Sequence, residues 1–424
     1  MVDDILSIQK CSNDTVKMNA VINSFVEGKK LKLSGKKCHR IHVQNKKIKN
    51  HPKCKDLKVH EQPMKNSTQE KYLGDVINSN GTVRDTIDDR KNKGFGIVNE
   101  IIALLDEIPL GRYKMEIGLK LRQAMLLNGM LYNSEAWHSL GESEIRILET
   151  VDEHLLRSLV KGQSKTPLEF LYLEAGAIPI RMIIASRRLL YHQTILKRED
   201  HELTKRIYKE QRSNPTPGDF VDLLHEDFKL INDKQDDDVI QNTNSSVYKK
   251  EIKSKIREAA FKYLQNIKEK HSKIKHIKYQ KLEVQKYMTS PIFTNQEVNT
   301  LYALRSRSTE CKENFKQKYI NSNLLCPLCE DENENQQHIL KCRVLLSQFE
   351  TTNLTKENVT YEDLFSPDVH KQKVITMMFI ELFELRKKLQ ENRNSQPAPS
   401  PTVPVELRMS NDLLDCTVYS SFGK

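Results

Sequence analysis

The sequence predicts a mainly α-helical fold, with a small α+β segment at the N-terminus and a Cys/His cluster near the C-terminus. Apolar residues recur at the 3.6-residue spacing of helices over most of residues 84–286. Alternating apolar residues bounded by turn-forming residues, which are typical of short strands, occur within residues 31–83, and residues 1–8 have the pattern of two strands joined by an acidic turn. A hydrophobic fraction of 38% in a chain of 424 residues is enough for helical cores.

The first 83 residues are expected to contain one helix and several short strands. Ser12 and Asn13 can cap the helix, and Gly28 ends it. The expected elements are a helix over residues 9–27, strands at 31–33 and 41–43, a polar loop over 44–69, and a strand pair that begins at 72–77 and turns at Asn80-Gly81.

Helices are expected for most of the chain from residue 84 onward. Pro109 and Gly111 close the first of these helices, and a break at Gly176–Pro179 divides a later one. The remaining expected segments are a helical region over 112–138, helices over 142–161 and 167–197, a linker over 232–246, a long basic helix over 247–286, and a proline-containing disordered tail over 393–424.

Positive charge is the main feature of the composition. The formal net charge is +11, and the window 247–286 holds 13 Lys/Arg against 4 Asp/Glu. This balance favours a polyanionic partner such as nucleic acid, although a solvated, lysine-rich surface would have the same composition. Lys253 and Arg257 in this helix, and Arg187 and Arg188 in the preceding one, are the candidate phosphate contacts.

No apolar run reaches the roughly 18 residues of a membrane span, and no secretory signal pattern is visible at the N-terminus. Eight cysteines are too few for a disulfide framework in a chain of this length. We therefore expect an intracellular protein, in the nucleus or the cytoplasm, with no membrane partner.

Three cysteines and a histidine near the C-terminus have the spacing of a metal site. Cys326, Cys329, His338 and Cys342 form the pattern C-x2-C-x8-H-x3-C. The first pair can place two thiolates on one ion, and the second pair can project from one turn of a helix. Four such ligands predict a closed, structural Zn²⁺ site, whose binding contributes on the order of 10–16 kcal/mol in small fingers.

A second Cys/His group, made up of Cys38, His39, His42, His51 and Cys54, is too loosely spaced to predict a metal site.

Two adjacent carboxylates, Asp3 and Asp4, lie between apolar residues at the start of the chain. An acidic turn of this kind can hold Mg²⁺ and so support phosphoryl transfer by two metal ions. Two acids near an N-terminus more often cap a helix or face solvent.

In their order along the chain these features resemble the C-terminal part of a non-LTR retrotransposon reverse transcriptase. The segments that carry the resemblance are Met1-Val2-Asp3-Asp4, Lys36-Lys37-Cys38, Lys71-Tyr72-Leu73-Gly74, Asn133-Ser134-Glu135-Ala136-Trp137 and the Cys/His cluster at 326–342.

The resemblance implies a role for each matched residue. Asp3 and Asp4 would bind Mg²⁺ in the polymerase centre, and Lys37 would donate a proton to pyrophosphate. Tyr72, Leu73 and Gly74 would form the primer grip. The zinc knuckle would help to bind the RNA template, whose copying starts from a DNA primer.

The resemblance also divides the chain into segments. In order they are a palm remnant (1–83), a helical thumb (84–213), a basic helical connection (214–322), a CCHC zinc knuckle (323–345), a helical segment (346–392) and the tail (393–424). Because the family's fingers and first palm half precede the Asp-Asp box, we expect the chain alone to lack polymerase activity. The alternative is a non-enzymatic zinc-knuckle protein that binds nucleic acid, and a protein-interaction scaffold is a third hypothesis.

Overall fold

The computed structural model describes residues 6–9, 12–31, 33–34, 37–43, 57–59, 62–107, 113–162, 166–319, 323–349 and 359–395. Within these residues the chain is mostly helical, as the sequence predicts. Asp3, Asp4 and the tail from residue 396 onward lie outside the described residues.

The N-terminal segment consists of one helix and short paired strands. Strand β1 pairs in parallel with β4, while β2 pairs with β3 and β5 pairs with β6 in antiparallel fashion. The elements are α1 (Ser12–Gly28), β1 (His39–Ile41), β2 (Lys58–Val59), β3 (Gln62–Pro63), β4 (Lys65–Ser67), β5 (Gln69–Tyr72) and β6 (Asp75–Asn78).

Three sequence predictions for this segment are wrong. Leu31 and Leu33, expected to lie in a strand, belong to none of the described strands. The region 44–69, expected to be a loop, contains β2, β3 and β4 among its described residues. The β5–β6 hairpin turns at Leu73 and Gly74 instead of Asn80-Gly81, and these two residues have positive φ angles of 47° and 93°. Two successive residues with positive φ form a turn whose twist matches that of the flanking strands.

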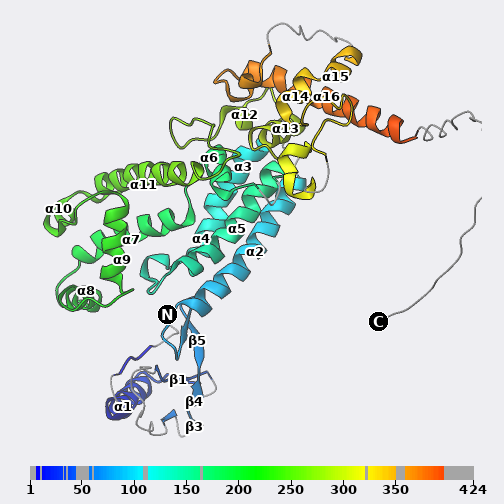
Figure 1. Cartoon of the computed structure of the whole chain (residues 1–424). Coiled ribbons are helices and arrows are strands. Elements are labelled where there is room, and N and C mark those ends of the chain that lie inside the picture. The colour runs from blue at the N-terminus through cyan, green and yellow to red at the C-terminus, as the bar shows by residue number, and fades with distance from the viewer. Residues whose placement is uncertain are drawn as a thin grey trace, which may run out of the picture.

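The β5–β6 hairpin contacts the first helix of the helical body, α2 (Arg84–Glu107). The hydroxyl of Thr86 accepts a hydrogen bond from the N–H of Val76 at 2.9 Å. The guanidinium of Arg90 lies 2.9 Å from Asp75, and Arg90 is only 3% exposed. These contacts place the hairpin at the foot of α2 (Figure 1).

The helical body follows in chain order. Its elements are α2, α3 (Lys114–Leu121), the π-helical turn η2 (Arg122–Leu127), α4 (Asn128–Met130), η3 (Ser134–Ala136), α5 (Glu142–Val160), α6 (Leu168–Ala175), α7 (Ile180–Leu196), α8 (Leu203–Ser213), α9 (Phe220–Leu230), α10 (Asp237–Asn242), α11 (Ser245–Lys268), α12 (Lys286–Thr289), α13 (Asn295–Arg305), η4 (Lys312–Tyr319), α14 (Gln336–Lys341), α15 (Arg343–Gln348), η6 (Tyr361–Phe365) and α16 (Val369–Ser395).

The buried core is continuous from Val83 to Leu382. It therefore crosses the boundaries near residues 213 and 322 that the resemblance places between the thumb, the connection and the zinc knuckle. Helices α2 and α5 pack closely at Gly94, because a Cβ atom there would lie 2.9 Å from Val151. The predicted break between α6 and α7 is confirmed, since Gly176 ends α6 in the left-handed conformation and Pro179 precedes α7.

Two further predictions are corrected in the middle of the chain. The segment 232–246, predicted as a linker, contains α10, and the side-chain amide of Gln193 donates to the carbonyl of Ile240 at 2.9 Å. The long basic helix ends at Lys268 rather than at 286. The ammonium group of Lys268 is buried and donates to the carbonyls of Lys275 and Ile277, so the chain folds back at this point.

Among the described helices, none combines the length and the apolar character that crossing a membrane requires.

Candidate metal centre

The first two ligands of the predicted cluster lie on a tight turn. Leu325 and Asn333 form an antiparallel bridge, and the N–H of Cys326 donates to the carbonyl of Glu332 at 2.7 Å. Glu330, with φ of 60°, supplies the left-handed residue that closes the turn. The C-x2-C spacing therefore places Cys326 and Cys329 on the same side of this turn.

Of the other two ligands, His338 lies on α14 and Cys342 is the residue at which that helix ends. The side-chain oxygen of Asn335 accepts a hydrogen bond from the N–H of His338 at 2.8 Å and so caps this helix. Cys342 follows His338 by four residues, which is about one helical turn. Both side chains consequently face the Cys326–Cys329 turn.

One donor atom from each of the four residues lies within 4.8 Å of the other three. The Sγ atom of Cys329 is 3.3 Å from Nε2 of His338. Metal–ligand distances of about 2.0–2.3 Å in a tetrahedral zinc site require donor separations of roughly 3.4–3.8 Å. The described residues thus form a Cys3His cluster that can hold a metal ion such as zinc, and the predicted grouping of these four residues is confirmed.

Neighbouring groups orient the ligands. The Nδ1 atom of His338 lies 3.1 Å from Glu332, which leaves Nε2 directed toward the cysteines. Burial raises the pKa of the Cys326 thiol to about 11. Burial acts in the same direction on Cys329, but hydrogen bonds from the backbone N–H groups of Asp331 and Glu332, together with those from the Cys326 and Cys342 thiols, outweigh it and lower the pKa of the Cys329 thiol. A bound cation would favour the thiolate form of both cysteines.

The cluster belongs to the packed body of the protein. Cys326 is 0% exposed and Cys342 is 1% exposed. Glu334, between the two ligand pairs, is completely buried; its carboxylate accepts hydrogen bonds from the backbone N–H of Lys312 at 3.0 Å and from Arg386 at 2.7 Å. Glu334 therefore joins the cluster to both η4 and α16.

The loosely spaced second group does not assemble in the described residues. Cys38, His39 and His42 form no cluster with metal-ligand geometry there, and His51 and Cys54 lie outside the described residues. The ring of His39 instead lies 2.9 Å from the carboxylate of Glu70.

The residues matched to a polymerase centre are only partly described. Asp3 and Asp4 lie outside the described residues, and Lys37 is exposed on a turn where its N–H donates to Ser34. Leu73 is 57% exposed at the tip of the β5–β6 hairpin, beside Gly74.

Arg187 and Arg188 were expected to contact nucleic acid, but both side chains are used inside the fold. Arg188 is 3% exposed and lies 2.8 Å from the buried carboxylate of Asp227. Arg187 donates to the carbonyls of Leu127 and Leu131, where the helical turns of that region end. Arg188 is therefore a core ion-pair residue, and this part of the prediction is corrected. The reason is that α9 covers it, which the local sequence does not show.

Lys253 and Arg257 are exposed, as their predicted role requires, and lie one turn apart on α11.

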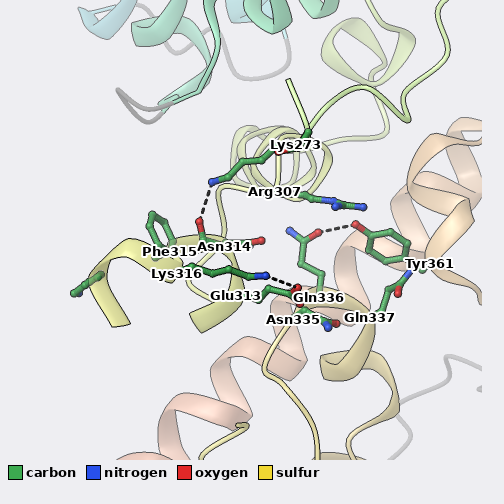
Figure 2. A pocket seen from close by; sticks show the side chains of 12 residues that line it. Lys273, Arg307, Glu313, Asn314, Phe315, Lys316, Asn335, Gln336, Gln337 and Tyr361 are labelled. Atoms are coloured by element: carbon green, nitrogen blue, oxygen red, sulfur yellow. Dashed lines mark hydrogen bonds and ion pairs between the residues drawn. The ribbon is translucent and has the colours of Figure 1, made fainter. Parts of the chain in front are cut away.

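The sequence did not indicate a pocket of about 820 Å³ that borders the metal cluster (Figure 2). The residues immediately before His338 form one side of it. Its cationic side chains are Lys273, Arg307, Lys316 and Lys318, and its single carboxylate is Glu313. The lysines around Phe315 were the only local sequence feature that could have indicated a cationic pocket, because its other lining residues come from distant parts of the chain.

No family model, curated protein or solved structure matches this chain. The resemblance to reverse transcriptases therefore stays a prediction from the sequence motifs.

Proposed function

We propose that this chain is a zinc-containing nucleic-acid-binding protein. The observation that carries the proposal is the convergence of Cys326, Cys329, His338 and Cys342 within 4.8 Å in a strongly basic chain. Three thiolates and one imidazole suit zinc, and hard cations such as Mg²⁺ prefer oxygen ligands.

The zinc ion would have a structural role. Four protein ligands complete a tetrahedral shell, so no position is left for water or substrate. The ion would hold the Cys326–Cys329 turn against α14. The hydrogen bonds of Glu334 to Lys312 and Arg386 would connect this turn to η4 and α16.

Nucleic acid is the partner that the charge supports. The net charge is +11, and Lys253 and Arg257 extend into solvent from α11. Each phosphate contact with a single strand lowers the slope of log K against log salt by about 0.7. Binding should therefore weaken steeply as salt is added.

The test compares two cysteine variants of the full chain. Cys329→Ser should lose bound zinc, measured by elemental analysis, and should weaken binding of a fluorescein-labelled single-stranded RNA, measured by anisotropy. Cys311→Ala is the matched control, because Cys311 is a buried free cysteine outside the cluster. It should keep both zinc and affinity.

If the affinity for RNA changes neither with salt concentration nor on replacement of Cys329, the proposal is contradicted.

A second candidate function, part of a reverse transcriptase, is favoured by the β5–β6 hairpin. Its tip presents Tyr72, Leu73 and Gly74, the residues that the resemblance assigns to a primer grip. Exposure of Leu73 leaves an apolar side chain free to contact a primer. In that case Asp3 and Asp4 would bind Mg²⁺.

This candidate predicts tighter binding to an RNA–DNA primer–template junction than to single-stranded RNA. Leu73→Asn should remove the preference without unfolding the hairpin, because Asn tolerates the left-handed conformation that Leu73 adopts. Equal affinity for the junction and for the single strand would count against a primer grip.

A further inference from the structure

The pocket beside the metal cluster is enclosed by parts of the chain that are distant from one another in the sequence. Lys273 comes from the turn after α11, Arg307 follows α13, and Lys316 lies on η4. The fourth side is the segment that enters α14 and leads to His338. Figure 2 shows these side chains around one hollow. Among its described lining residues, four cationic side chains outnumber one carboxylate, Glu313, which lies 3.3 Å from Lys316, so the pocket carries net positive charge.

Arg307 occupies a backbone position that normally favours glycine. Its φ is 51°, in the left-handed region. The N–H of Arg307 donates to the carbonyl of Leu304 at 3.1 Å, and that of Ser308 donates to Ala303 at 2.9 Å. These two bonds form the Schellman motif that ends α13, in which the left-handed residue is usually glycine.

An arginine in this position carries conformational strain, because its Cβ atom crowds the backbone in the left-handed conformation. Strained residues of this kind concentrate where a side chain has a functional task. The side chain of Arg307 is one of those that line the pocket.

The remaining wall offers groups that suit bases as well as phosphates. Phe315 and Tyr361 are half-buried aromatic residues on the two sides of the pocket (Figure 2). The ammonium group of Lys273 lies 5.5 Å from the centre of the Phe315 ring. Gln337 presents an exposed side-chain amide immediately before His338.

We propose that this pocket binds a short segment of single-stranded nucleic acid, with phosphates on Lys273, Arg307 and Lys316 and a base against an aromatic wall. The inference rests on the proposed function and assigns it a site. Stacking on aromatic side chains combined with a cationic groove is the usual way in which proteins hold single strands. A volume of about 820 Å³ exceeds what a lone phosphate needs.

The test uses Arg307→Gly in the full chain with zinc bound. Glycine relieves the left-handed strain, so the melting temperature should stay the same or rise while the pocket loses one cation. The matched control is Lys161→Gly. Lys161 is an exposed cation at the end of α5, has a φ of 46°, and lies outside this pocket. Both variants therefore lose one positive charge at a left-handed position.

The probe is a fluorescein-labelled oligouridylate of about twelve nucleotides, titrated at several salt concentrations. Arg307→Gly should weaken binding about fivefold or more and reduce the magnitude of the salt slope by about 0.7, the contribution of one phosphate contact. Lys161→Gly should bind like the original chain. Inorganic phosphate at the same phosphate concentration should not displace the probe, because it has no base to stack.

Four results would contradict the proposed binding pocket. If Arg307→Gly binds as tightly as the original chain, or if Lys161→Gly loses as much affinity, the strand lies elsewhere, and the proposed function still stands. Displacement of the probe by inorganic phosphate would reduce the site to a phosphate site. If the original chain binds no oligouridylate at any salt concentration, the pocket and the proposed function both fall.

Discussion

Arg305 and Glu174, 131 residues apart in the chain, form a buried ion pair in which Nη2 of Arg305 lies 2.9 Å from Oε1 of Glu174. The hydroxyls of Tyr279 and Tyr287 also donate to this carboxylate. The other side of the guanidinium donates to the carbonyl of Leu364 at 2.7 Å. This network joins α6 to α12, α13 and η6, and so connects the central helices to the C-terminal part of the body.

Replacing Glu174 with Gln should destabilise the protein strongly. The substitution leaves the cation of Arg305 buried without its partner, which typically costs about 3–5 kcal/mol. Urea unfolding followed by circular dichroism measures the change. Glu116→Gln is the control, because its pair with Lys120 is exposed and should contribute less than about 1 kcal/mol. A similar small effect for both variants would contradict the structural role of Glu174.

Arg188→Met should lower stability without a specific effect on RNA binding. Asp227 would lose its buried partner, so we expect a cost of about 3–5 kcal/mol. The folded fraction should bind RNA with unchanged affinity and salt slope, measured by anisotropy below the unfolding temperature. If the variant is as stable as the original chain but binds RNA more weakly, Arg188 contacts RNA instead.

Gly176→Ala should destabilise the junction between α6 and the segment before α12. Gly176 has a φ of 58°, and a Cβ atom there would lie 2.2 Å from the backbone nitrogen of Val284. The left-handed conformation alone costs about 1–2 kcal/mol, and displaced backbone adds to it. Gly96→Ala, in α2 with open space around it, should be neutral or stabilising by up to about 1 kcal/mol. Thermal unfolding distinguishes the two.

His276 should make the protein less stable in mild acid. Burial, and then the nearby cations Arg307, Arg305 and Lys268, lower its pKa from 6.5 to about 4. Between these pH values the unfolded chain binds a proton that the folded chain does not, so the free energy of unfolding falls as pH drops from 6.5 to about 4.

His276→Gln should therefore reduce the loss of stability in that window and leave stability above pH 7 little changed. Zinc release at low pH affects both proteins alike, so the difference between their denaturation midpoints reports on His276. Parallel pH curves for the two proteins would exclude this role.

Local patterns predicted the elements whose causes are local. The break at Gly176–Pro179 follows from the residues themselves, because proline cannot continue a helix and glycine can end one. The turn at Leu73-Gly74 was missed because Leu rarely adopts a positive φ, while Asn80-Gly81 carries the commoner signal.

The sequence by itself determined the mainly helical character and the four ligands of the Cys3His cluster, since both depend on spacings of a few residues. Only the tertiary structure decided that Arg188 is buried, that Glu174 pairs with Arg305, and that Arg307 faces a pocket with Lys273. The same Lys or Arg serves in a core ion pair or on a binding surface. Which role it takes depends on the distant segments that fold against it.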